Sequence, residues 1–308
     1  MPYHLRPWTE RDTGIDREVS QSVYPEYREE PGHRAWFAAR QLGAPRDFST
    51  RYVVEGTAEG RTVAYATLWE LRPGRYRFDL AVRPECRRRG IGTRLFTQLI
   101  DDARALRATG LQARVRDDKP EALAFVLRRR FHESHRMGAY HRDFVPSDAD
   151  RMQPAIQRLS DLGIAVISLA DVRKRDADYL SRFCELYSAA REGWPDPDPD
   201  PAGPTIMPFD ALAQWLEEVK LPEAFFLATH EARYVAFSSL FGIGTAVHPQ
   251  FRGRSIATHL RAMVVADAPR RGLRADTTST ANPAMQAVLE RLGYRRLWSE
   301  IRLIRSLE

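Results

Sequence analysis

The sequence predicts an α+β protein made of two copies of one domain, and three observations lead to this expectation. The chain has 308 residues, which is enough for two domains of ordinary size. Strand-like and helix-like segments alternate along both halves, and one motif of the first half returns in the second half. Apolar residues make up 43% of the chain and aromatic residues 10%, so both copies have material for a hydrophobic core.

The first half begins with strand patterns and continues with an amphipathic helix. Strands are expected at 3–7, 51–56, 62–70 and 76–82, with a helical region that ends near residue 41 between the first two. Ile91, Leu95 and Leu99 then recur on one face of a helix, which stops at Gly110. The half is completed by a strand at 111–115, a helix that starts at Pro120 and strand-like residues at 133–144.

The second half repeats this order. Strands are expected at 164–169, 224–229 and 234–240, and helices at 176–191 and 208–220. The predicted domains are therefore 1–146 and 163–308, joined by a linker and helix at 147–162. Between two helices of the second domain lies WPDPDPDPAGP, residues 194–204, in which prolines alternate with aspartates, so the segment is expected to be stiff and extended.

One motif of the first half has the residue types of an anion-binding site. A strand ends in Val-x-Pro, three arginines follow, and two glycines open the helix; these residues are Val82, Pro84, Arg87, Arg88, Arg89, Gly90 and Gly92. A helix N-terminus exposes unpaired N–H groups, glycine lets a bulky anion approach the backbone, and arginine adds forked donors. This first motif (82–93) therefore predicts a cradle for a pyrophosphate.

The same arrangement returns as the second motif (247–258). Val247-x-Pro249 ends a strand, Arg252 follows, and an apolar helical face starts at Ile256. The repeat is far longer than the unit of a solenoid, so it indicates an internal duplication of a whole domain. A solvated turn with a helix cap is the alternative for one motif alone, and the recurrence weakens it.

Two nucleotide-binding motifs do not fit. A P-loop requires Gly-Lys-Ser/Thr, whereas Gly90-Ile91-Gly92-Thr93 has no lysine. A Rossmann fingerprint requires a third glycine at the position of Leu95.

The first motif resembles the signature of the GCN5-related N-acetyltransferases, Val-x-Pro followed by Arg/Gln-x-x-Gly-x-Gly/Ala at a strand–loop–helix junction. The second motif departs from it at Ser255, where the family has glycine, and has Ala257 at the last position. Residues 277–294 resemble the family's Thr…Asn-x-x-Met…Leu-Gly-Phe ending through Asn282. In the first half the weaker counterpart of this ending has Asp118 for the asparagine and Arg130 for the glycine. The resemblance implies two tandem domains, each a central mixed, mostly antiparallel sheet flanked by helices.

The resemblance also implies acetyl-CoA as the acyl donor, and no metal is expected. Backbone amides at the end of the fourth strand would meet the pantetheine and the thioester oxygen, here at Leu80, Ala81 and Val82. The pyrophosphate would lie on Arg87, Arg88, Arg89, Gly90, Ile91, Gly92 and Thr93. The second copy offers the corresponding residues Val247, Arg252, Gly253, Arg254, Ser255, Ile256, Ala257 and Asn282.

The catalytic groups are less clear from the residues. Acetyl transfer to an amine requires a base for the ammonium proton, a polarised carbonyl and a stabilised thiolate. Asp79 and Glu70 are the candidate bases. Many family members stabilise the thiolate with a tyrosine, but the matching positions hold Val126 and Leu289. Three tyrosines elsewhere could stabilise the thiolate instead, or could be buried residues of the sheet or core: Tyr76, Tyr140 and Tyr294. His248, which directly follows a strand, is a further candidate for a catalytic role.

The expected activity is acetyl-CoA-dependent N-acetylation of a primary amine of a small molecule, and the aspartates of residues 194–204 favour a cationic acceptor. A binding or scaffold protein, in which one or both domains have lost the chemistry, is the first alternative. A nucleic-acid binder that uses Arg87–Arg89 and Arg128–Arg130 is the second, and it lacks interleaved aromatic residues.

The composition limits partners and location. The net charge is +6, but acidic residues are interspersed with the arginines, so no nucleic-acid partner is expected. No apolar run approaches the roughly 18 residues of a spanning helix, and the N-terminus lacks a signal-peptide core. Cys86 and Cys184 form neither a disulfide framework nor a metal spacing. A cytoplasmic protein without a membrane partner is predicted, with the oligomeric state left open.

Overall fold

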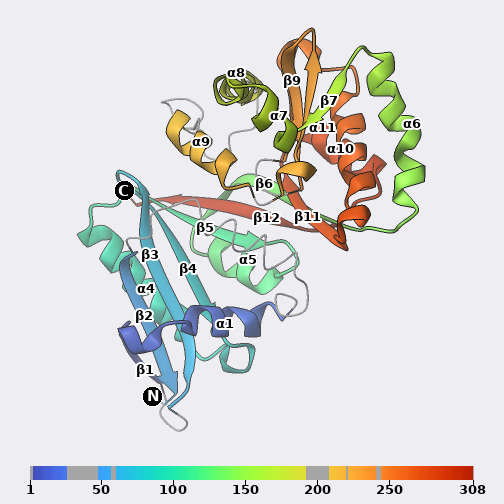
Figure 1. Ribbon diagram of the computed structural model, residues 1–308. Helices are drawn as coiled ribbons and strands as arrows, with labels where there is room; N and C mark the ends of the chain where they lie inside the picture. The colour runs from blue at the N-terminus through green and yellow to red at the C-terminus, as the bar shows by residue number, and fades with distance from the viewer. Residues whose placement is uncertain are drawn as a thin grey trace. The chain divides into compact units, whose positions relative to one another are not determined.

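The computed structural model describes residues 3–25, 48–56, 60–191, 208–219, 221–240 and 244–307. The chain divides into two compact units, shown in Figure 1. The N-terminal unit holds residues 1–136 and 299–308, and the C-terminal unit holds residues 137–298. Both units combine helices with mostly antiparallel strands, which confirms the predicted α+β class.

The N-terminal unit is built on one sheet. Its strands are β1 (Tyr3–Pro7), β2 (Phe48–Gly56), β3 (Thr62–Arg72), β4 (Arg75–Val82), β5 (Gly110–Arg116) and the C-terminal strand β12 (Arg295–Ser306), in the spatial order β1-β2-β3-β4-β5-β12. Neighbouring strands are antiparallel except β4 and β5, which are parallel. The predicted strands at 3–7, 51–56, 62–70, 76–82 and 111–115 are therefore confirmed, whereas the helical region that was to end near residue 41 lies outside the described residues.

Helices cover both faces of this sheet. They are α1 (Ile15–Val23), α4 (Ile91–Ala105) and α5 (Pro120–Leu127), with short 3-10 turns at η1 (Glu10–Asp12) and η2 (Pro84–Cys86). The predicted apolar face of α4 is buried, because Leu95 and Leu99 have no exposed surface and pack with Leu68 of β3. On the opposite face α1 packs through Val19 onto Val53 and Tyr65.

The C-terminal unit contains a four-stranded antiparallel sheet in the order β10-β9-β8-β7 and a second ladder between β11 and β6. The strands are β6 (His132–Asp143), β7 (Ala165–Ser168), β8 (Phe226–His230), β9 (Arg233–Ser238), β10 (Thr245–Val247) and β11 (Ala275–Thr280). The helices are α6 (Asp148–Asp161), α7 (Leu169–Arg175), α8 (Tyr179–Arg191), α9 (Phe209–Glu217), α10 (Ile256–Asp267) and α11 (Pro283–Arg291), with 3-10 turns η3 (Pro222–Ala224), η4 (Pro249–Phe251) and η5 (Pro269–Arg271).

The last strand of each sequence half belongs partly to the other half's unit. Residues 300–306 of β12 pair with β5 in the N-terminal unit, as Figure 1 shows for the red strand. Residues 138–143 of β6 pair with β11 in the C-terminal unit. The compact units therefore differ from a simple division of the chain, and the predicted domain boundaries at 146 and 163 stay a prediction.

Candidate functional site

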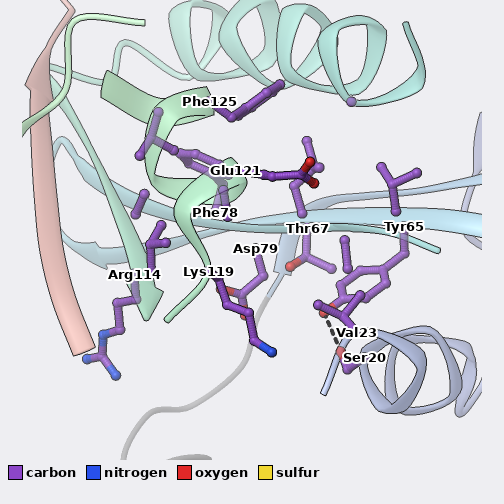
Figure 2. A pocket seen from close by; sticks show the side chains of 18 of the residues that line it. Ser20, Val23, Tyr65, Thr67, Phe78, Asp79, Arg114, Lys119, Glu121 and Phe125 are labelled. Carbon is purple, nitrogen blue, oxygen red and sulfur yellow. Dashed lines mark hydrogen bonds between the residues drawn. The ribbon is translucent and has the colours of Figure 1, made fainter. Parts of the chain in front are cut away.

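The parallel strands β4 and β5 are paired only along part of their length. Arg75–Arg77 pair with Gly110–Gln112, and the register ends there, so Phe78–Val82 and Ala113–Arg116 are not joined by a ladder. A cavity of about 1320 Å³ lies at this opening, and most of its lining residues come from β3, β4, β5, α1, α5 and the start of α4. Figure 2 shows Phe125 and Glu121 above the strands and Asp79, Lys119 and Arg114 below them, so the cavity has side chains from both faces of the sheet.

The first motif forms the loop between β4 and α4 at one end of this cavity. Arg88 and Gly90 have the left-handed φ angles +62° and +81°, and Gly90 is the N-cap of α4. The first N–H groups of a helix have no intrahelical partner, so those of residues 91–93 are free to bind an anion. The cavity lining includes Arg87, Arg88, Gly90, Ile91, Gly92 and Thr93, and also Leu80, Ala81 and Val82, while Arg89 is not part of it.

The two glycines of the loop act for different reasons. Nothing lies within 4 Å of a Cβ built on Gly90, so its positive φ is what favours glycine there. A Cβ on Gly92 would lie 3.4 Å from Cε2 of Phe125 and 3.8 Å from Cδ2 of Leu80. Any longer side chain at Gly92 would therefore enter the cavity where α4, α5 and β4 meet.

Arginines fix the loop against its neighbours. Arg87 Nε donates to the Val82 carbonyl at 3.3 Å, and Arg87 Nη1 lies 3.6 Å from Glu121 Oε2. Arg129 Nη2 donates to Thr93 Oγ1 at 2.9 Å, and its guanidinium lies 3.4 Å from the centre of the Phe125 ring. Sequence reasoning missed Arg129 as a site residue, because its contact with the helix start depends on how α5 is folded against α4.

The two faces of the opening differ in chemistry. On the side of α4 and α5, Phe78 and Phe125 line the cavity, and both pack against the edge or face of Phe96. On the side of α1, most of the lining residues are polar. Tyr65 Oη and Ser20 Oγ form a hydrogen bond of 2.9 Å, drawn in Figure 2, and burial followed by the charge of Asp79 raises the pKa of Tyr65.

The two candidate bases lie in different places. Asp79 is exposed, lines the cavity and stands opposite Thr67 in the β3–β4 ladder. Glu70 is not among the lining residues, and its Oε1 accepts a hydrogen bond from the Gly74 N–H in the β3–β4 turn at 3.0 Å. The structure therefore brings Asp79 to the opening, while the Glu70 carboxylate holds a turn.

Comparison with known proteins agrees with this geometry. Residues 15–131 and 183–294 match the model of the acetyltransferase (GNAT) family. The chain belongs to this family. No curated protein matches the chain.

Solved structures share the fold of the GNAT chain over nearly its whole length. A GCN5-related N-acetyltransferase from Sphaerobacter thermophilus is 17% identical, with a TM-score of 0.69 over 99% of this chain and 96% of that one. A tandem GNAT protein from the clavulanic acid biosynthesis pathway is 20% identical, with a TM-score of 0.63 over 99% and 98%. A glucosamine N-acetyltransferase region of a fungal multi-domain GH3 β-N-acetylglucosaminidase is 13% identical, with a TM-score of 0.65 over 98% of this chain and 38% of that one.

The second motif has the same backbone conformation as the first. Gly253 and Ser255 have φ angles of +79° and +59°, matching Arg88 and Gly90. Arg252 Nε donates to the Val247 carbonyl at 3.2 Å, as Arg87 does to Val82. Ser255 holds a left-handed conformation that costs a non-glycine residue about 1 kcal/mol.

The surroundings of the second motif differ from those of the first. Arg252 Nη2 donates to the Ala190 carbonyl of α8 at 2.9 Å. Gly253 and Arg254 precede the N-cap of α10, and Ile256 and Ala257 are its first two residues, of which Ile256 is buried. The strands beside the two motifs also differ, because the described strands β10 and β11 belong to different sheets, whereas β4 and β5 pair over three residues.

A buried polar cluster occupies the C-terminal unit beside α10. Arg261 donates to the Ser239 carbonyl, to Asp276 and to the Tyr294 hydroxyl. Arg261, Asp276 and Tyr294 are each 5% exposed or less. Burial raises the pKa of Asp276 and of Tyr294. In the N-terminal unit the matching positions of α4 and β5 hold Phe96 and Leu111, so the ionic cluster stands where the other unit has apolar core residues.

The remaining candidates have structural contacts. Asn282 is the N-cap of α11 and its side chain accepts from the Ala284 N–H at 2.9 Å. The matching N-cap of α5 is Lys119, so Lys119 and not Asp118 stands at the asparagine position. His248 Nδ1 accepts from the Gln250 N–H and Nε2 lies 2.9 Å from Arg233 Nη2.

The positions examined for a catalytic tyrosine are apolar core. Val126 and Leu289 are 4% and 1% exposed. Tyr140 and Tyr294 are buried in the C-terminal unit, and Tyr76 packs in the core of the N-terminal unit. The proline- and aspartate-rich segment at 194–204 lies outside the described residues. Of the described helices, none is long and apolar enough to cross a membrane.

Proposed function

We propose that the chain is an acetyl-CoA-dependent N-acetyltransferase that acetylates the primary amine of a small molecule, and that the N-terminal unit carries the reaction. One observation carries the proposal: the opening between β4 and β5 joins a cavity to a loop that presents free N–H groups and arginines. The family membership supports the reaction class.

The residues of the N-terminal unit fit the parts of acetyl-CoA. The loop at Arg87, Arg88 and Gly90–Thr93 would hold the pyrophosphate, with Arg129 adding a further guanidinium through its contact with Thr93. Phe78 and Phe125 offer an apolar wall for the pantetheine arm. The unpaired edge of β4 at Leu80–Val82 offers backbone groups to the thioester oxygen and the arm.

Bound acetyl-CoA supplies an acetyl group as its thioester. Asp79 takes a proton from the acceptor ammonium, directly or through a water, and the free amine nitrogen attacks the carbonyl carbon. A C–N bond forms and the C–S bond breaks. The nitrogen of the tetrahedral intermediate releases a second proton to solvent, and the departing thiolate takes one up from solvent. Amide N–H groups at the end of β4 stabilise the oxyanion.

The C-terminal unit is proposed to bind acetyl-CoA weakly or not at all. Ser255 adds a side chain where the first motif has Gly90, and Arg252 is engaged by the Ala190 carbonyl. Val247, Gly253, Arg254, Ile256, Ala257 and Asn282 then serve the fold of this unit. The expected preference for a cationic acceptor rests on Asp196, Asp198 and Asp200, which lie outside the described residues, and it stays a prediction.

An assay of thiol release from acetyl-CoA over a panel of amines, with the product identified by mass spectrometry, tests the proposal. Asp79→Asn should lower kcat by about 10²-fold or more, because the ammonium proton loses its acceptor. Glu70→Gln is the matched control and should keep the wild-type kcat, since Glu70 binds the turn at Gly74.

Two results would contradict this account. If Asp79→Asn keeps the wild-type kcat across the pH range, Asp79 is not the base that accepts the ammonium proton. If acetyl-CoA binds and no amine in the panel is acetylated, the chain is a binding protein, an alternative that the absence of a tyrosine at Val126 and Leu289 favours.

A further inference from the structure

Arg77 and Arg114 bring guanidinium groups to the polar side of the cavity. Arg77 lies on β4, is half-buried, and donates through Nε and Nη2 to Gln112 Oε1 at 2.9 and 2.5 Å. Arg114 lies on β5, and its Nε is 3.5 Å from Glu300 Oε1 of β12. Both arginines line the cavity. Among the described residues, Arg77 Nη1 and the two Nη atoms of Arg114 have no hydrogen-bond partner.

The positive charge at this place is only partly neutralised. Arg77 hydrogen-bonds to a neutral amide, and Gln112 is 4% exposed, so the amide fixes the guanidinium without offsetting its charge. Arg114 stands directly opposite Arg302 in the β5–β12 ladder, a pairing of like charges that costs stability. Burial, with the charges of Arg114 and Arg302, lowers the pKa of Arg77 to about 9, against the opposing effect of Asp79 and Glu300.

Arg77 lies close to the proposed base Asp79. Arg77 and Asp79 are alternate residues of one strand and point to the same face, about 7 Å apart along β4. Asp79 lies next to the strand end at Leu80–Val82, where the acetyl group is proposed to be held. A small acceptor with its amine at Asp79 therefore reaches Arg77 with a group only a few bonds away.

We propose that the acceptor carries an anionic oxygen group, a carboxylate or a phosphate, beside its amine, and that Arg77 and Arg114 bind this group. The inference rests on the proposed function of the same cavity. An arginine fork held by Gln112 matches the planar oxygens of such a group, and binding removes the like-charge repulsion within the cluster. The subsite selects amino-acid-like or phosphorylated amines over amines without an anionic group, and for the N-terminal unit this proposal replaces the expectation of a purely cationic acceptor.

Matched pairs of acceptors test the subsite, with acetyl-CoA as donor. The pairs are glycine with glycinamide, β-alanine with 3-aminopropanamide, and phosphoethanolamine with ethanolamine, so the first two report on a carboxylate and the third on a phosphate. The anionic member of at least one pair should have a kcat/KM tenfold or more above its neutral partner. Arg77→Gln should reduce this ratio to threefold or less, mainly through KM. Arg77→Lys should retain part of it, because the charge remains and the fork is lost.

Arg104→Gln is the matched control, since Arg104 is exposed on α4 and pairs only loosely with Asp101. It should leave the ratio unchanged. Calorimetric titration of the acetyl-CoA-loaded protein with acetate and with inorganic phosphate gives a second readout, in which the binding seen with wild type is lost in Arg77→Gln. Circular dichroism of Arg77→Gln identifies a variant that does not fold, and Arg77→Lys then takes its place.

The outcomes separate this inference from the proposed function. If neutral amines are acetylated as well as their anionic partners, or the ratio persists in Arg77→Gln, the subsite is overturned and the acetyltransferase stands. If the anions bind through Arg77 and no amine in any pair is acetylated, the subsite stands and the proposed function fails. Absence of both anion binding and a charge preference overturns the subsite.

Discussion

Arg6 ties the first strand of the N-terminal unit to two carboxylates. Its Nη1 and Nη2 donate to both oxygens of Asp12 at 2.7 and 2.8 Å, and its Nε donates to Glu55 at 3.0 Å. Asp12 is 3% exposed and also accepts from the Thr9 N–H and hydroxyl. The Arg6 hydrogen bonds hold the pKa of Asp12 well below its ordinary value of 3.8.

Asp12→Asn should therefore lower the free energy of unfolding of the N-terminal unit by about 2 kcal/mol at pH 7. A carboxylate with a lowered folded-state pKa stabilises the fold above its ordinary pKa and loses this contribution as the pH falls. The difference between wild type and variant should thus shrink below about pH 4. Urea unfolding at pH 7 and pH 3 measures it. Asp101→Asn, at an exposed site on α4, is the control, and an equal loss of stability in both variants would contradict the role of Asp12.

Single residues also show what the sequence could not reveal. Arg129 reaches Thr93 only because α5 folds back onto the start of α4. The charge at Arg77 and Arg114 depends on the pairing of β5 with a strand from the far end of the chain. By contrast, the strand–loop–helix junction of the first motif was predicted from its residues alone, although one of its two left-handed positions is Arg88 and not a glycine.

At the scale of elements, α4 and α10 begin with the same loop and differ in what they bury. The sixth residue of α4 is Phe96 and that of α10 is Arg261, while the second residue of β5 is Leu111 and that of β11 is Asp276. Removing one partner of a buried ion pair leaves the other charge uncompensated, at about 3–5 kcal/mol, whereas apolar replacement of both is often neutral or better.

Asp276→Asn should accordingly destabilise the C-terminal unit by about 3 kcal/mol or more. The double variant Arg261→Phe with Asp276→Leu, which installs the residues of the first copy, should recover most of this loss. Thermal unfolding of the three proteins measures the difference. A double variant that is less stable than Asp276→Asn would show that the cluster contributes more than the apolar core it replaces.

The elements divide clearly into those the sequence predicts and those it does not. Amphipathic periodicity located α4, and Pro120 located the start of α5, because both signals are local. The helix α7 was missed, since Leu169 reads as the end of a strand and is in fact the first helical residue after the Ser168 cap. The pairing of β12 with β5 was also missed, because a hydropathy pattern does not indicate which distant strand pairs with a given strand.

At the scale of the whole molecule, a duplicated chain forms two units that have diverged in their sites. Each half contributes part of its last strand to the unit of the other half, so neither unit is made from one half alone. The N-terminal unit combines an opened strand pair, a loop at a helix N-terminus, and a cavity with one apolar and one mostly polar side. The C-terminal unit repeats the loop, with Ser255 in place of glycine and an ionic cluster in place of an aromatic one.

The proposed division of labour between the units is tested most directly by calorimetric titration of the intact chain with acetyl-CoA. One site per chain is predicted. Gly92→Leu should weaken its Kd at least tenfold, or about 1.4 kcal/mol, because the new side chain meets Phe125 and Leu80. Ala257→Leu, at the matching position of α10, should leave Kd within about twofold of wild type. Two equal sites per chain, or a loss of binding in Ala257→Leu with none in Gly92→Leu, would contradict the account.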